Sequence, residues 1–311
     1  MCGIIGYLNK SGSSSPPLGS IMRSMLQALG NRGPDSAGVA LYGDTGEGAL
    51  ILRVKLGEGG DLRDRGEQIK SRVERMGKVR GASVVSEYLR MVVDYEGDLN
   101  ALQREVEALS PDVEVISAGL RLEIAKQVGS PDDLDRTYGI SAFRGTHGIG
   151  HTRLSTESRV DLSHSQPFWA HGVPDLATVH NGHITNYHKL RRQYEMKGHR
   201  FYTENDSEII GMYLAGRMAK GDDLEEALRA SIRDLDGSFS YLVATADTIG
   251  FAKDSFGLKP LIVAETDAFV AIATEEIALR RTFRTAFEAI EPQPKSVKVW
   301  KLPPSKAAKA A

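Results

Sequence analysis

The single cysteine of this 311-residue chain stands at position 2, directly after Met1. Once Met1 is removed, Cys2 is the first residue and carries both a thiol and a free α-amine. The thiol can attack a carbonyl carbon, and the amine, with a reference pKa of about 7.7–8.0, can accept and return the proton at neutral pH. Cys2 therefore has the parts of a nucleophile with its own base. Taken alone, however, a lone cysteine is more often buried and unreactive.

Four further residues suit the cleavage of an amide in an amino-acid substrate. Attack on an amide creates an oxyanion, which the side-chain amide of Asn181 and the backbone N–H of Gly182 can stabilise. The carboxylate and the ammonium of the substrate need an arginine and a carboxylate, for which Arg153 and Asp206 are candidates. Each also has a structural interpretation, because Asn–Gly is a common turn and Asp206 stands where it could cap a helix.

The elements that must position these residues begin at the amino terminus. Residues 2–8 are an apolar run between glycines, which predicts a buried strand. Apolar residues at four-residue spacing predict a helix over 21–29 that ends at Gly30. A turn over 31–38, with two glycines and a proline, and a strand over 39–42 are expected to follow.

The second half of the chain holds the other candidate residues. We expect Arg153 in a strand over 148–156 that leads into a loop, and Asn181 where a strand over 177–182 ends in a sharp turn. Later apolar runs predict strands buried on both faces, as layered sheets require. The predicted helices span 188–196 and 209–218, and the later strands span 237–244, 249–253, 261–264 and 268–273.

Residues 57–146 are expected to form a small α/β subdomain inserted into a domain that spans 1–300. This stretch has its own alternation of strands and helices, and Asp98 and Ser130 stand where each can cap a helix. The residues 301–311 are expected to be a disordered tail. The predicted strands of the subdomain span 89–93, 113–116 and 120–124.

Composition limits the classes of function. Lysine plus arginine (39) nearly balances aspartate plus glutamate (41), so no bulk charge favours nucleic acid or an anionic membrane as a partner. Without a basic, apolar leader or a run of about 18 apolar residues, we expect a cytoplasmic protein. One cysteine excludes an intramolecular disulfide and a cysteine-based structural zinc site, and the eight histidines show no metal-ligand pattern. We therefore expect no metal.

Six motifs occur in the order seen in class II glutamine amidotransferases, and the chain strongly resembles that family. The resemblance covers about 2–56 and 147–300. It implies an α+β fold of the N-terminal nucleophile hydrolase type, a four-layer αββα sandwich, with the inserted subdomain as an addition. The motifs are CGIIG (2–6), RGPDS (32–36), GHTR (150–153), HNG (180–182), NDSE (205–208) and DGSF (236–239).

The resemblance also implies a role for each candidate residue. Cys2 would be the nucleophile and its amine the base, while the side chain of Asn181 and the backbone of Gly182 would form the oxyanion hole. The turn that starts at Arg32 would pack beside the amino terminus as a scaffold. The substrate-binding residues would be Arg153 at the glutamine carboxylate, Asp206 at the ammonium, and Thr156 also near the substrate.

Three positions depart from the family pattern without removing a catalytic group. Leu154 stands where many members have an aromatic residue, Glu157 where some have histidine, and Asn205 in place of serine or threonine. These departures affect the outer contacts of the pocket.

The segments HTRLSTES (151–158) and SQPF (165–168) resemble the free-standing amidotransferase subunits of glutamate-synthase-type complexes, N-methylglutamate synthase in particular. This resemblance implies L-glutamine as substrate and a synthase on a separate chain that receives the ammonia. It also implies that FMN and an iron–sulfur cluster lie on partner subunits, with no cofactor on this chain. Two alternatives stay open: a stand-alone amidase acting on a γ-glutamyl compound, and a catalytically degenerate structural subunit.

Overall fold

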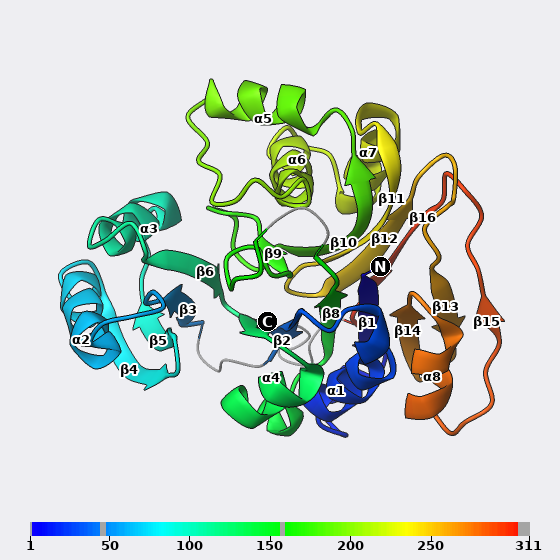
Figure 1. The fold of residues 1–311 in the computed structure, drawn as a ribbon, viewed down its shortest axis with the longest axis horizontal. Coiled ribbons are helices and arrows are strands. Elements are labelled where there is room, and N and C mark those ends of the chain that lie inside the picture. Colours follow the sequence, from blue (N-terminus) through cyan, green and yellow to red (C-terminus); the bar gives the residue numbers. More distant parts are fainter. Residues whose placement is uncertain (1, 44–47, 156–158, 304–311) are drawn as a thin grey trace.

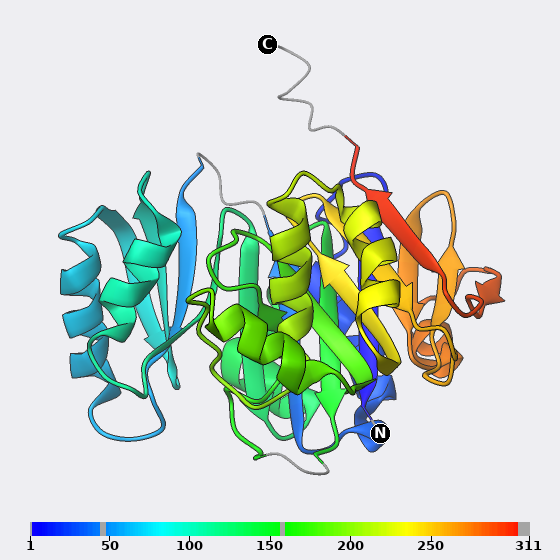
Figure 2. The ribbon, with the colours of Figure 1, turned by 90° about the horizontal axis from the view of Figure 1, so that it is seen from above.

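The computed structural model describes residues 2–43, 48–155 and 159–303. Two β-sheets pack face to face, with helices α5, α6 and α7 on the outer side of one sheet and α1, α4 and α8 on the outer side of the other (Figures 1 and 2). The predicted four-layer αββα sandwich is therefore confirmed. The helices span Leu18–Ala28 (α1), Pro131–Tyr138 (α4), Tyr187–Glu195 (α5), Glu208–Met218 (α6), Leu224–Asp234 (α7) and Glu276–Thr282 (α8).

One sheet, within the described residues, has seven strands in the order β15-β13-β14-β1-β8-β2-β7, and its neighbouring strands are antiparallel. The first strand of the chain, β1, lies between β8 and β14 and is hydrogen-bonded along both edges. The strands span Gly3–Asn9 (β1), Ser36–Tyr42 (β2), Leu122–Val128 (β7), His147–Arg153 (β8), Ile262–Glu265 (β13), Phe269–Ala273 (β14) and Ala289–Ile290 (β15).

The second sheet of the sandwich, counted over the same residues, has five strands in the order β16-β12-β11-β10-β9, again with antiparallel neighbours. Its central pairing joins β10 and β11 over eight residue pairs, from Ala177↔Ala244 to Ile184↔Gly237. The strands span Phe168–Trp169 (β9), Ala177–Ile184 (β10), Gly237–Ala244 (β11), Thr248–Lys253 (β12) and Val297–Lys301 (β16).

Buried apolar side chains fill the spaces between the four layers. Ile4 and Leu242 belong to the core between the two sheets, Met22 to the core beneath the seven-stranded sheet, and Ile210 to the core above the five-stranded sheet. Full burial of each such side chain stabilises the fold by about 1.5–3 kcal/mol. None of the helices in the described ranges is long and apolar enough to cross a membrane.

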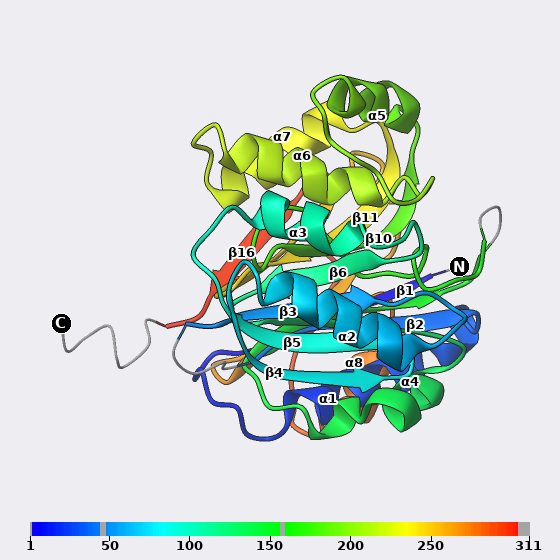
Figure 3. The same ribbon diagram turned by 90° about the vertical axis from the view of Figure 1, so that its left-hand side faces the viewer.

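A smaller sheet with the order β4-β5-β3-β6 stands to one side of the sandwich, and α2 and α3 cover its outer face (Figure 3). We call residues 50–119 the small unit. Asp98 caps α3 by accepting a hydrogen bond from Asn100 N at 3.0 Å, as expected. The elements span Leu50–Lys55 (β3), Leu62–Val73 (α2), Lys78–Val85 (β4), Tyr88–Asp94 (β5), Leu99–Glu107 (α3) and Glu114–Gly119 (β6).

The small unit differs from the subdomain expected over 57–146. Strand β3 precedes that range yet is an inner strand of the small sheet, between β5 and β6. Conversely, β7 pairs along the whole of β2 in the seven-stranded sheet, and α4 packs Leu134 into the core beneath it. Alternation of strands and helices along a sequence does not reveal which sheet a strand joins, so the expected range took in part of the sandwich.

A lysine is buried where the small unit meets the sandwich. Lys126 on β7 is only 2% exposed, and its Nζ lies 5.0 Å from the centre of the Phe168 ring. Burial lowers the Lys126 pKa from 10.5 to about 8, and attraction to Glu114 is offset in part by repulsion from Lys55. Lys55 itself lies 3.6 Å from Glu114 and donates to Ser163 Oγ.

We predict that Lys126→Met stabilises the fold at neutral pH. The unfolded lysine holds its proton up to a pKa of about 10.5 and the folded one only to about 8. At pH 7 the charged form therefore costs about 3 kcal/mol of folding free energy, and this cost declines as the pH rises from about 8 to 10.5. Urea denaturation at pH 7 and pH 10 should show a more stable variant, with the smaller advantage at pH 10.

Lys55→Met is the matched control, because it removes a lysine that has close partners and leaves the buried Glu114 without its ion-pair partner at 3.6 Å. That variant should be less stable than the wild type at pH 7. A Lys126→Met protein no more stable than the wild type at pH 7 would show that the buried charge carries no such cost.

Candidate active site

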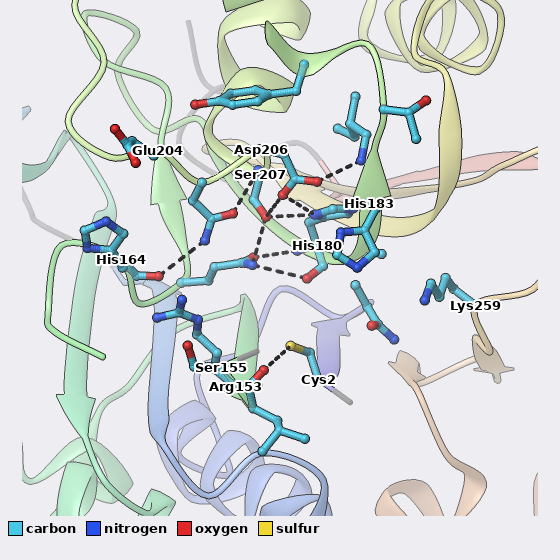
Figure 4. Close-up of a pocket in the computed structure, with 18 of the residues that line it drawn as sticks. Cys2, Arg153, Ser155, His164, His180, His183, Glu204, Asp206, Ser207 and Lys259 are labelled. Atoms are coloured by element: carbon cyan, nitrogen blue, oxygen red, sulfur yellow. Dashed lines mark hydrogen bonds and ion pairs between the residues drawn. The ribbon is translucent and has the colours of Figure 1, made fainter. Parts of the chain in front are cut away.

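A pocket of about 970 Å³ opens where the ends of β8 and β10 meet the start of β1 and the segment before α6 (Figure 4). This volume lies at the upper end of the range of ligand sites, roughly 300–1,000 Å³. Thr156 lies outside the described residues. The other predicted site residues, Cys2, Arg153, Asn181, Gly182 and Asp206, all line this pocket.

Cys2 is held at the pocket by the strand that it begins. Pairing of Gly3 with Thr152 places the start of β1 beside the end of β8, and Cys2 Sγ lies 3.9 Å from the carbonyl oxygen of Leu154. Arg32 Nε donates to the Cys2 carbonyl at 3.3 Å, and Arg32 Nη1 pairs with Glu275. The turn after α1 therefore packs beside the amino terminus, as expected.

The same turn holds the end of β8. Asp35 N donates to the carbonyl of Arg153 at 3.0 Å, and Asp35 Oδ2 accepts from Ser155 N at 2.7 Å. Gly33 lies against this backbone so closely that a Cβ would stand 2.4 Å from the carbonyl carbon of Thr152. The RGPDS motif thus fixes the two neighbouring walls of the pocket that carry Cys2 and Arg153.

Arg153 lies on the same side of the pocket as Cys2 (Figure 4). The residue is 4% exposed, and Nη1 donates to the carbonyl of Arg159 at 2.9 Å. Burial lowers the Arg153 pKa, an effect that the nearby Cys2 opposes. A buried guanidinium beside the thiol can bind a carboxylate by charge-assisted hydrogen bonds.

Asn181 lies inside a strand, which corrects the expectation that the strand ends in a sharp turn at 181–182. Strand β10 continues to Ile184, and Gly182 pairs with Phe239 of β11. Gly182 has φ +144°, and a Cβ there would lie 2.2 Å from the carbonyl oxygen of Ser238. Glycine is therefore needed for close approach of two strands and for its backbone conformation.

Asn181 is 5% exposed as a residue, and it lines the pocket. Its side-chain amide makes no hydrogen bond to another of the residues that the structure describes. The amide can therefore donate a hydrogen bond to a ligand in the pocket.

Asp206 lies on the opposite wall of the pocket from Cys2 and Arg153 (Figure 4). It does not cap α6 with its side chain. Its Oδ2 instead accepts from Ile184 N at 2.7 Å, and its Oδ1 lies 3.8 Å from His180 Nδ1. The carboxylate therefore secures the end of β10, and the sequence pattern that suggested a helix cap reflects only its position just before the helix.

A buried hydrogen-bond network behind the pocket was not foreseen. Gln166 Oε1 accepts from His180 N at 2.7 Å, and Gln166 Nε2 donates to Ser207 Oγ at 3.1 Å. Ser207 Oγ also lies 2.7 Å from His180 Nδ1. His151 Nε2 lies 3.2 Å from the His180 carbonyl, and burial lowers the His151 pKa to about 3. Both histidines thus connect the segments around the pocket by hydrogen bonds, as their places in the strand-end motifs predict.

Other lining residues escaped sequence reasoning because no local pattern distinguishes them. Glu204 and Lys259 border the pocket from two distant segments of the chain. Gln166 stands within the SQPF motif, and this motif could have indicated the hydrogen-bond network behind the pocket. Within the described residues, no three His, Cys, Asp or Glu side chains are grouped as a metal site requires.

The pocket therefore combines a thiol, a cation, a side-chain amide and a carboxylate. The cation and the carboxylate lie on different walls, which suits an α-amino acid with its two charges. The thiol and the amide can serve nucleophilic attack on a carbonyl group and stabilisation of the oxyanion.

Comparison with known sequences gives three informative matches. Residues 151–281 match the family model described as a glutamine amidotransferase domain. A protein of Methanothermobacter thermautotrophicus named as a glutamine amidotransferase is 39% identical over 308 residues, which are 97% of this chain and 100% of the relative. The glutamine amidotransferase-like protein GlxB of Rhizobium meliloti is 36% identical over 302 residues, 96% of this chain and 98% of the relative.

Longer proteins match over part of their length. The amidophosphoribosyltransferase of Methanocaldococcus jannaschii is 32% identical over 177 residues, 57% of this chain and 38% of that protein. Among solved structures, the glutamine phosphoribosylpyrophosphate amidotransferase of B. subtilis superposes with a TM-score of 0.60 at 17% identity. That superposition covers 98% of this chain and 50% of the solved chain, and it shows a common fold.

Proposed function

The chain belongs to the class II glutamine amidotransferase family, and on that premise we propose that it hydrolyses L-glutamine to glutamate and ammonia with Cys2 as nucleophile. One observation carries the proposal. Five residues from segments far apart in the chain line a single pocket. From the sequence, they are the candidates for nucleophilic attack, for stabilisation of the oxyanion and for binding both charges of an amino acid.

In the proposed mechanism, the α-amine of Cys2 takes the proton from the thiol after Met1 has been removed. The sulfur attacks the side-chain amide carbon of glutamine, and the carbonyl oxygen becomes an oxyanion. The side chain of Asn181 and the backbone N–H of Gly182 stabilise that charge. The C–N bond then breaks, the leaving nitrogen takes the proton from the amine, and ammonia departs. Water hydrolyses the thioester to glutamate and restores Cys2.

Binding of glutamine is assigned to the two charged residues on different walls of the pocket. Arg153 holds the α-carboxylate and Asp206 the α-ammonium. Thr156 is proposed as a further contact to the substrate. Asp206 already accepts one hydrogen bond from Ile184 N, so the segment before α6 is held in place before the substrate arrives.

The ammonia is proposed to pass to a synthase on a separate chain, of the glutamate synthase or N-methylglutamate synthase type. FMN and an iron–sulfur cluster would then belong to the partner subunits. This proposal is supported by the resemblance of 151–158 and 165–168 to the amidotransferase subunits of such complexes. Gln166 and His164, both at the pocket, lie in or next to the second of these segments.

Loss of the thiol is the first test. Cys2→Ser should lose most glutaminase activity, because an alcohol is far less ionised than a thiol at neutral pH. Intact-mass analysis of active wild-type enzyme should show Cys2 as the first residue, since an amide bond to Met1 removes the basic amine. Full activity in protein that retains Met1 would show that the α-amine of Cys2 is not the base.

Asn181 and Asp206 should separate catalysis from binding. Asn181→Ala should lower kcat by roughly 100-fold or more, because it removes a contact that strengthens in the transition state.

Asp206→Asn should chiefly raise KM for glutamine, by an amount equivalent to about 2–3 kcal/mol, because it deletes the charge partner of the ammonium. Steady-state kinetics with Asp267→Asn, a change at an exposed turn, provide the control. Unchanged KM and kcat in Asp206→Asn would refute its assignment.

A synthase partner should stimulate the isolated chain, because uncoupled hydrolysis wastes glutamine. We expect slow hydrolysis by the purified chain and a higher kcat/KM when chains that co-purify from its native source are added. Full activity without any partner would instead favour a stand-alone amidase. Hydrolysis neither alone nor with partners would favour a degenerate structural subunit.

A further inference from the structure

The small unit touches the segment that carries Asp206. Helix α3 of the small unit and residues 198–202 of the sandwich line opposite sides of a second cavity of about 400 Å³, near Met212 of α6. Figure 3 shows α3 at the edge of the small unit that faces the helices of the sandwich. The contact therefore joins the small unit to the chain that leads into the glutamine pocket.

Glu107, at the end of α3, is the centre of this contact. Its side chain is 4% exposed, and Oε2 accepts from Tyr202 Oη at 2.6 Å. Its Oε1 accepts from Val115 N at 3.0 Å and from Gln103 Nε2 at 3.1 Å. Two of these donors belong to the small unit, so Glu107 is anchored there while it holds Tyr202 of the sandwich.

The Tyr202 ring is fixed on both faces. It stacks on the His171 ring with centroids 4.1 Å apart, and the Arg200 guanidinium lies 4.7 Å from its centre. Arg200 Nη1 lies 3.3 Å from Glu107 Oε2. The Tyr202 hydroxyl and the Arg200 guanidinium thus both contact the Glu107 carboxylate.

Hydrogen bonds lead from Tyr202 to the residues beside Asp206. Tyr202 N and Thr203 N donate to the carboxylate of Glu208 at 2.9 and 3.0 Å. Asn205 N donates to Thr203 Oγ1 at 3.1 Å, and Ser207 N donates to Asn205 Oδ1 at 3.1 Å. The segment 202–208 is therefore one hydrogen-bonded loop, with Tyr202 at its start and Asp206 near its end.

We propose that Glu107 is a positioning residue for glutamine, which holds Tyr202 and thereby sets the place of Asp206 at the substrate ammonium. The proposal rests on the glutaminase function proposed above. It assigns to the small unit a part in substrate binding, although α3 contributes no residue to the glutamine pocket.

A second contact connects the small unit to another wall of the same pocket. Lys55 of β3 donates to Ser163 Oγ at 2.5 Å, and Ser163 Oγ donates to Glu114 Oε2 of β6 at 2.6 Å. Ser163 directly precedes His164, whose carbonyl accepts from Asn205 Nδ2 at 3.5 Å. The small unit thus contacts both segments that meet at Asn205.

The test uses Tyr202→Phe and Glu107→Gln in the full chain. Tyr202→Phe keeps the stacked ring and removes only the hydroxyl, which donates to Glu107 Oε2 and accepts from Gln103 Nε2 of the same helix. Displacement of a substrate-binding group by about 1 Å can lower the rate of an enzyme by up to 100-fold. Here Ile184 and Arg191 still hold the segment, so we expect a smaller effect. The KM for glutamine should rise roughly tenfold, with kcat nearly unchanged. Loss of correctly folded protein would lower kcat and leave KM alone.

Glu105→Gln is the matched control, because Glu105 lies on the same helix and pairs with Arg72 and Arg75 inside the small unit. It should leave KM unchanged. Adding Glu107→Gln to Asp206→Asn should raise KM no further than Asp206→Asn alone, since both act at the same contact. Unchanged KM in Tyr202→Phe and Glu107→Gln, or additive effects with Asp206→Asn, would overturn the proposal.

Amide hydrogen exchange gives a readout that does not depend on catalysis. The amides of 202–208 should exchange faster in Tyr202→Phe and Glu107→Gln than in the wild type and in Glu105→Gln. Equal exchange in all four proteins would overturn the positioning role. If these amides exchange faster in the two variants but the wild type hydrolyses no glutamine, the contact of Glu107 with this segment is supported and the proposed function is rejected.

Discussion

The structure depends on the pairing of β1 in the interior of a sheet, which holds Cys2 in place. Residues near the end of a chain are ordinarily poorly ordered, because they have few contacts. Here β1 is hydrogen-bonded along both edges, to β8 and to β14. Arg32 adds a side-chain hydrogen bond to the carbonyl of Cys2 itself. These contacts provide the fixed position that Cys2 needs for its proposed role as nucleophile.

The rest of the pocket is built on buried polar groups that are hydrogen-bonded to one another. Gln166, His180 and Ser207 join the strand that carries Asn181 to the segment that carries Asp206. Burial lowers the pKa of both His151 and His180, because desolvation disfavours the charged form of the ring. Such a network is rigid because each lost hydrogen bond would leave a buried group without a partner. Preorganised walls of this kind are what oxyanion stabilisation needs.

The small unit is joined to the sandwich by polar and charged contacts as well as by apolar packing. Glu107 with Tyr202, and Lys55 with Ser163 and Glu114, lie at this junction, and Lys126 is buried close by. Polar contacts have strict geometry, whereas apolar packing tolerates small shifts. Such a junction can set the position of a segment that lines the pocket, in keeping with the proposed part of Glu107 in binding.

The sequence by itself determined the family, the candidate residues of the site and several strands. Cys2 and six ordered motifs indicated the family, whose fold is the layered sandwich, and five residues that line one pocket. Apolar runs predicted β1, β11 and β12, because burial on both faces leaves a local pattern. Only the tertiary structure decided that β3 joins the small sheet, that β10 runs on through Gly182, that Asp206 binds Ile184 N, and that Glu107 meets Tyr202. These features depend on which distant segments pair, and pairing energy between residues far apart in the chain leaves no periodic signal along it.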